Sequence, residues 1–175
     1  MTASSHTSAP SLPDEHAELL RALAEQRELL LITLKGISDA QARERTTVSE
    51  LTLGGILRHL VQGEEAWTRI MAGGDGELPD GMLDMEQYRM GERDSLAGLL
   101  ERYAAAARAT EEAVGGVGDL GRRVPLPVTP WSPPERQFWS VRRILLHLVR
   151  ETAQHAGHAD IVREALDGAN TTAQR

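Results

Sequence analysis

Hydrophobic residues recur at helical spacing over four stretches of the chain, and polar, glycine-rich or proline-rich segments separate these stretches. A period of about 3.6 residues is typical of an amphipathic helix with one buried face. The pattern predicts helices over residues 13–36, 53–73, 95–114 and 141–166. Residues suited to capping a helix N-terminus precede three of them, namely Thr52, Asp94 and Ser140. Four helices of this length predict an all-α fold, a four-helix bundle.

Two long connections join these helices. Residues 75–93 are rich in glycine, aspartate and methionine, and residues 118–139 hold five prolines that exclude a helix. We therefore expect a four-helix bundle with two long crossover connections, over residues 13–168. The Ser/Thr/Ala/Pro-rich residues 1–12 are expected to form a disordered tail, and residues 169–175 a C-terminal tail.

Composition narrows the class of protein. A chain of 175 residues with 41% hydrophobic and 26% charged residues is typical of one globular domain, and 3% aromatic residues disfavours an all-β fold. The absence of cysteine excludes disulfides and thiol nucleophiles. A net charge of −7 argues against nucleic acid, and no apolar run approaches the roughly 18 residues of a membrane span. We expect a cytoplasmic protein with a small-molecule substrate; a homodimer is left open.

The last predicted helix places ionisable residues among its apolar ones. At about 100° per residue, Glu151 and His155 fall on the apolar stripe, with His147 and His158 beside it. A carboxylate buried without a partner costs several kcal/mol, and a divalent metal would compensate it. Glu151 and His155, four residues apart, can bind one ion, with His59 of the second helix as the candidate third ligand.

A second interpretation needs no metal. His147, Glu151 and His158 could form a hydrogen-bonded core network with Arg150 and Arg163. In either case His147 and His158 are expected near the site as neighbours of the ligands or as substrate contacts, and not as ligands themselves.

The two long connections are expected to supply the walls of a pocket. Trp131 and Trp139 are the candidate lining residues, although both could instead be hydrophobic plugs over the end of the bundle. Glu64 and Glu65 follow His59 by five and six positions and do not share its face. We expect them at the surface, or near the site without binding the metal.

Two stretches resemble the DinB/YfiT-like superfamily of metal-binding four-helix bundles. LTLGGILRHLVQGEEAW (51–67) is similar to the second helix of that family, and LLHLVRETAQHAGHADIVRE (145–164) to its fourth. The resemblance implies a DinB-like bundle in which His59, Glu151 and His155 bind the metal; many members have histidine in place of Glu151. The sequence around His155 also resembles an actinobacterial branch that includes the mini-circle protein.

The resemblance implies a function as well. Relatives with assigned activity are thiol-dependent: bacillithiol and mycothiol S-transferases and a mycothiol-dependent maleylpyruvate isomerase. A metal-dependent transferase that activates an external low-molecular-weight thiol, such as mycothiol, for attack on a small electrophile is therefore expected. Zinc is the expected metal, with nickel, iron or manganese as alternatives. The other interpretations are a metal-dependent hydrolase and a non-catalytic bundle with a stress-response or interaction role.

Overall fold

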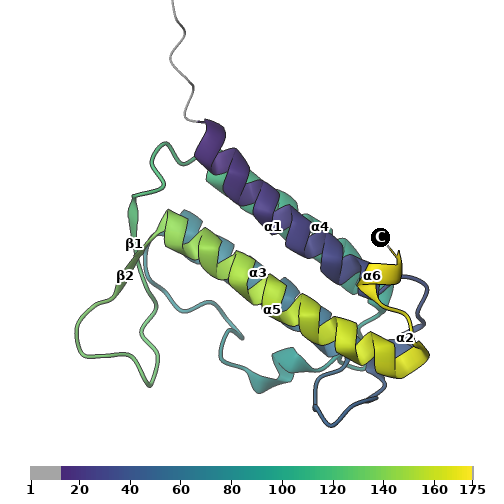
Figure 1. Ribbon diagram of the computed structural model, residues 1–175. Helices are drawn as coiled ribbons and strands as arrows, with labels where there is room; N and C mark the ends of the chain where they lie inside the picture. The colour runs from purple at the N-terminus through teal and green to yellow at the C-terminus, as the bar shows by residue number, and fades with distance from the viewer. Residues whose placement is uncertain (1–12, 175) are drawn as a thin grey trace, which may run out of the picture.

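The computed structural model describes residues 13–174, so the predicted disordered tail 1–12 lies outside the described residues. The elements in chain order are α1 (Pro13–Thr33), α2 (Asp39–Arg43), α3 (Leu53–Gly73), the 3₁₀ helix η1 (Met85–Tyr88), α4 (Leu96–Gly115), β1 (Arg123–Pro125), β2 (Phe138–Ser140), α5 (Val141–Asp167) and α6 (Thr171–Gln174). The predicted all-α, DinB-like bundle is confirmed, because α1, α3, α4 and α5 pack side by side with only a small two-stranded sheet beside them (Figure 1).

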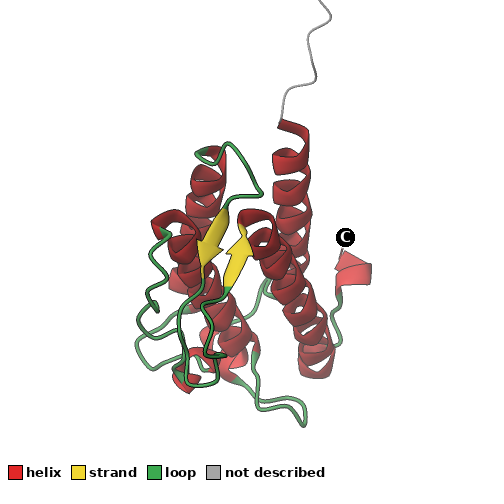
Figure 2. Ribbon diagram, turned by 90° about the vertical axis from the view of Figure 1, so that its left-hand side faces the viewer, coloured by secondary structure: helices red, strands yellow, loops and turns green. Residues whose placement is uncertain are grey.

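The bundle consists of two closely packed helix pairs, α1 with α5 and α3 with α4, and contacts between α3 and α5 join the pairs. α1 and α5 run in the same direction, and α3 and α4 run in the opposite one. The connection from α3 to α4 therefore travels the length of the bundle and carries η1 on the way (Figure 1). The strands β1 and β2 lie across the end of the bundle where α5 begins (Figure 2).

Helix N-caps agree with the sequence at two of the three predicted positions. The side chains of Thr52 and Ser140 accept hydrogen bonds from the backbone of the first turns of α3 and α5. The cap of α4 is Ser95, so the prediction of Asp94 is wrong by one residue. Asp94 instead accepts from the backbone N–H of Gly91 at 2.8 Å and closes the preceding turn.

Besides the connection that contains η1, three further segments expected to be irregular contain regular structure. Ser38 and Gln41 form a capping box that begins α2 within the polar stretch before α3. β1 and β2 pair antiparallel within the proline-rich connection, with Val124 opposite Trp139. The predicted C-terminal tail contains α6, held to α5 by the hydroxyl and backbone N–H of Thr171, which donate to Asp160. The first helix ends at Thr33, three residues before the predicted end.

The hydrophobic core is divided into two clusters. One lies near α2 and the start of α3, and it includes Leu57, Leu60 and Ala159. The other lies under the strands and includes Ile70 and Ile144. None of the described helices combines the length and the apolar character that a bilayer-spanning segment requires. Between the two clusters lies a layer of polar side chains from several helices, and the candidate site occupies this layer.

Candidate metal centre

The site lies between α3 and α5, which face each other in an antiparallel register. The rings of His59 and His155 meet edge to face, with their centroids 4.8 Å apart. Eight residues further along α3, Trp67 meets His147 in the same manner at 4.6 Å. The two ring pairs are separated by eight residues on both helices, which run in opposite directions, so each turn of α3 faces a defined turn of α5. Glu151 is four residues from His147 and from His155 and therefore lies midway between the two ring pairs.

His59, Glu151 and His155 bring three candidate donor atoms within 4.8 Å of one another. Two donors on one zinc ion at about 2.0–2.2 Å lie at most about 4.4 Å apart, so small side-chain rotations would bring all three onto one ion. Two imidazoles and one carboxylate are a donor set that zinc, nickel, iron and manganese accept. The cluster could therefore hold a divalent metal with three protein ligands, which leaves a position for a further ligand.

The orientation of His59 is fixed by a residue outside the bundle helices. Its Nδ1 donates to the amide oxygen of Gln87 in η1 at 3.0 Å, and the amide nitrogen of Gln87 donates to the carbonyl of Met82 at 3.1 Å. This chain assigns the proton of a neutral His59 to Nδ1 and leaves the Nε2 lone pair for a metal. The ring of Tyr88 also stacks on the ring of His59, with the centroids 4.4 Å apart.

A glycine pair at the start of α3 lets η1 approach closely enough to make these contacts. A Cβ atom on Gly55 would lie 2.3 Å from the carbonyl oxygen of Tyr88, and one on Gly54 would lie 2.5 Å from the sulfur of Met90. Any side chain at either position would push the η1 segment away from α3. The sequence Gly54-Gly55 thus positions Gln87 and Tyr88 against His59.

Glu151 is held as a carboxylate. Burial raises its pKa, but the hydrogen bond from Arg150 at 2.8 Å, the charge of Arg150 and the charges that His147 and His155 carry when protonated outweigh burial and bring the pKa below its usual range. One oxygen faces Arg150 and His147, and the other lies 4.0 Å from Nε2 of His155. The carboxylate therefore lies between Arg150 and His147 on one side and His155 on the other.

The histidines of the site are held neutral. The pKa of His155 is lowered to about 4, chiefly by burial and next by the charge of a protonated His59, against the opposing effect of Glu151. Burial likewise lowers the pKa of His59 and of His147. Nδ1 of His155, a residue that is only 8% exposed, has no hydrogen-bond partner among the described residues. Neutral, partly unsatisfied imidazoles are the form of histidine that binds metal ions.

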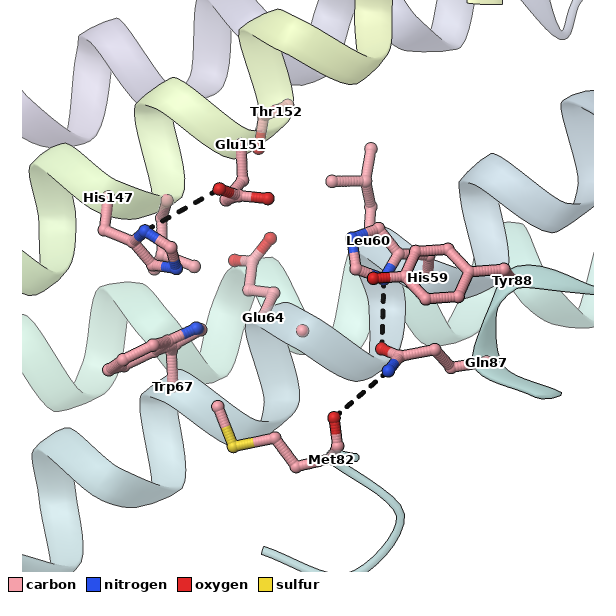
Figure 3. A pocket seen from close by; sticks show the side chains of 12 residues that line it. His59, Leu60, Glu64, Trp67, Met82, Gln87, Tyr88, His147, Glu151 and Thr152 are labelled. Carbon is pink, nitrogen blue, oxygen red and sulfur yellow. Dashed lines mark hydrogen bonds and ion pairs between the residues drawn. The ribbon is translucent and has the colours of Figure 1, made fainter. Parts of the chain in front are cut away.

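A cavity of about 220 Å³ opens beside this cluster (Figure 3). The carboxylates of Glu151 and Glu64 point into it from α5 and α3. Its wall also contains Gln87, Thr152 and a set of apolar and aromatic side chains: Leu60, Trp67, Met82, Tyr88 and Leu148. An apolar wall with a few convergent polar groups is typical of a small-molecule site.

Of the two positions expected for Glu64, at the surface or near the site without binding the metal, the structure shows the second, because Glu64 is buried and lines the cavity. It is only 3% exposed and forms a buried ion pair with Arg27 of α1, which is 6% exposed. The hydroxyl of Thr110 donates to Glu64 at 2.7 Å and accepts from Thr68 at 2.8 Å. Glu65, by contrast, is exposed as expected and pairs with Arg102. A helix wheel cannot show that Glu64 faces α1 and α4, because those neighbours are set by the packing of the bundle.

The comparison with protein families agrees with this geometry. The family model for mycothiol-S-transferase matches residues 18–168, which include most of α1, all of α3, α4 and α5, and the whole site. The chain belongs to the mycothiol-S-transferase family. No curated protein matches the chain. Among solved structures, the chain is similar to a conserved protein from Enterococcus faecalis, with 16% identity and a TM-score of 0.63 over 92% of this chain and 100% of that one. At that identity the likeness shows the fold alone.

Within this member of the mycothiol-S-transferase family, the other predicted site residues lie at different distances from the cavity. His147 lines it, accepts from Arg150 at 2.8 Å and packs against Trp67. His158 is half-buried one turn beyond His155 and is not among the residues lining the cavity. Only part of the alternative network is present, because Arg163 bonds to Asp167 and to backbone carbonyls.

The two tryptophans differ in their relation to the site. The ring of Trp139 lies parallel to that of Trp67 at 5.1 Å, so it supports the cavity wall from behind. Trp131 lies in the turn between β1 and β2, is 73% exposed and does not line the cavity. Trp131 is thus not the lining residue that was expected, because the hairpin extends away from the helices (Figure 1). Of the two long connections, the one with η1 supplies lining residues and the hairpin does not.

The most important residue that the sequence did not reveal is Gln87. A glutamine in an irregular connection carries no local signal, and its role follows only from the approach of η1 to α3. The sequence Gly54-Gly55 at the start of a helix is the one local signal that could have indicated such a close approach.

Proposed function

We propose that this protein is a divalent-metal-dependent transferase that joins an external low-molecular-weight thiol of the mycothiol type to a small electrophile. The observation that carries the proposal is the His59–Glu151–His155 donor cluster beside a cavity with an apolar wall. The family supports the same class of chemistry. Since the chain has no cysteine, the sulfur must come from a cosubstrate.

His59, Glu151 and His155 would hold the metal, with zinc as the expected ion. When bound, a divalent cation stabilises the thiolate form of a thiol and so lowers its pKa below about 8.5. Gln87 keeps the proton of His59 on Nδ1, and Arg150 keeps Glu151 ionised. These contacts fix the charge and direction of the donors before any ligand arrives.

The remaining residues of the cavity would position the cosubstrate and the electrophile. Trp67, Met82 and Leu60 offer apolar surface and exclude water, while Glu64 and Thr152 offer hydrogen-bonding groups. In the reaction the thiolate sulfur attacks the electrophilic carbon, a C–S bond forms, and the leaving group departs with its electron pair. The proton of the thiol passes to solvent.

The test is a conjugation assay on purified protein whose metal content has been measured. Mycothiol and 1-chloro-2,4-dinitrobenzene are the substrates, and chloride is the leaving group. Because the thiol would be ionised in the site, the catalysed rate should be nearly constant from about pH 7 to about 9, while the uncatalysed rate rises with thiol ionisation. Glu151→Ala should abolish the catalysed rate, and Lys35→Ala, on the α1–α2 connection, should not.

Protein that binds metal stoichiometrically and accelerates no thiol conjugation would contradict the proposal. Ester hydrolysis by the same preparation would then favour a metal-dependent hydrolase. No activity of either kind would favour a structural metal.

A further inference from the structure

The α3 side of the cavity has a glycine, Gly63, at its centre. His59, Gly63 and Trp67 follow one another at four-residue spacing, and all three line the cavity. On α5 the opposite residues are His155, Glu151 and His147. The contacts of the outer pairs, at 4.8 and 4.6 Å between ring centroids, place Gly63 opposite Glu151.

Close packing does not explain this glycine. A Cβ atom on Gly63 would meet nothing within 4 Å, whereas one on Gly54 or Gly55 of the same helix would collide with neighbouring atoms. Gly63 lies in the middle of a 21-residue helix, where glycine is less favourable than alanine. A side chain at position 63 would therefore be compatible with the packing of the core and would favour the helix.

What Gly63 does provide is space in front of a candidate ligand. The ring pair His59–His155 closes the gap between α3 and α5 on one side, and the ring pair Trp67–His147 closes it on the other. The gap between these ring pairs is open because position 63 has no side chain. A ligand that enters there arrives beside Glu151, in the middle of the cavity.

We propose that Gly63 is the specificity-determining residue of this site: it leaves an aperture one side chain wide through which the sulfur and the adjoining carbon chain of a thiol reach the metal. This inference rests on the proposed function for the identity of the ligand. The size of the aperture can be tested with metal ligands that are not thiols.

The experiment uses the full chain loaded with Co²⁺, whose visible absorption changes when an exogenous ligand binds. Azide, imidazole and N-acetylcysteine are titrated into the wild type, Gly63→Ala and Gly63→Leu. The alanine should weaken N-acetylcysteine binding about tenfold or more and leave azide within about threefold, because the methyl group would extend into the aperture and obstruct the larger ligand more than the smaller one. The leucine should exclude N-acetylcysteine and imidazole.

Gly157→Ala is the matched control. Gly157 is also a helical glycine whose Cβ would meet nothing within 4 Å, but it is exposed and does not line the cavity. Both alanine variants should raise Tm by about 1–4 °C, since alanine favours the helix. Gly157→Ala should bind all three ligands as the wild type does. Elemental analysis should find equal cobalt in every variant.

The outcomes separate the two proposals. If N-acetylcysteine binds the wild type and both Gly63 variants equally, the aperture is refuted and the proposed function stands. If no thiol binds the wild type but imidazole does, and Gly63→Leu excludes it, the aperture is supported and the thiol function is refuted. If no ligand changes the spectrum of the cobalt-loaded wild type, the site has no open position and the aperture is refuted.

Discussion

Nδ1 of His59 lies 3.0 Å from the amide oxygen of Gln87, and the amide nitrogen of Gln87 is in turn bound to the carbonyl of Met82. A residue of the long α3–α4 connection thus sets the tautomer of a candidate metal ligand on the bundle. Contacts of this kind to the second nitrogen of a ligating histidine increase metal affinity by about 10- to 100-fold.

We therefore expect Gln87→Met to weaken zinc binding by about 10- to 100-fold, because the thioether of methionine is only a weak acceptor for the hydrogen bond from His59. Titration calorimetry of the metal-free protein measures the affinity. Gln137→Met, in the exposed hairpin, is the control and should bind zinc as the wild type does. Unchanged affinity in Gln87→Met would show that the η1 contact does not orient His59.

The three candidate ligands should respond alike to substitution. His59→Ala, Glu151→Ala and His155→Ala each leave two donors, too few to hold zinc firmly. Elemental analysis after dialysis should find little metal in all three variants and nearly the wild-type amount in His158→Gln, because His158 is not in the donor cluster. Equal metal loss in His158→Gln would make it a ligand.

Removing only one charge of the buried Arg27–Glu64 pair should destabilise the folded protein. Arg27→Met leaves the carboxylate of Glu64, 3% exposed, without its cation, which should reduce the free energy of unfolding by about 3–5 kcal/mol. The double variant Arg27→Met/Glu64→Leu removes both charges and should recover most of this loss. Urea unfolding of the single and double variants forms a double-mutant cycle. Additive losses would mean that the two charges do not interact.

Acidification should destabilise the metal-free protein. The pKa of His155 falls from the ordinary 6.5 to about 4 because the side chain is buried, so between these values the unfolded chain binds more protons than the folded one. The contribution is complete above about pH 6.5 and is lost as the pH falls toward 4; for His155 it is on the order of 3 kcal/mol.

The measurement is urea unfolding at pH values from about 7 to about 4.5, with the metal removed. His155→Gln, whose side chain does not titrate, should show a smaller decrease of the free energy of unfolding over this range. The same decrease in both proteins would assign the effect to other groups, such as His59 and His147, whose pKa values burial also lowers.

Apolar periodicity and capping residues predicted the long helices, because both depend on residues close together in the chain. The periodic apolar residues gave the four long helices, and Thr52 and Ser140 capped two of them as expected. Where two cap residues stood side by side, as Asp94 and Ser95 do, the sequence could not decide between them. The choice depended on the turn that Asp94 closes with Gly91.

The sequence by itself determined the bundle and the face of α5 that carries Glu151 and His155, because both follow from the 3.6-residue period of a single helix. Only the tertiary structure decided that Gln87 binds His59, that Glu64 is buried against Arg27, and that Gly63 lies opposite Glu151. Each of these depends on which helix or connection packs alongside and in which register. Residues far apart in the chain acquire that register from the packing of the whole core, which no local pattern contains.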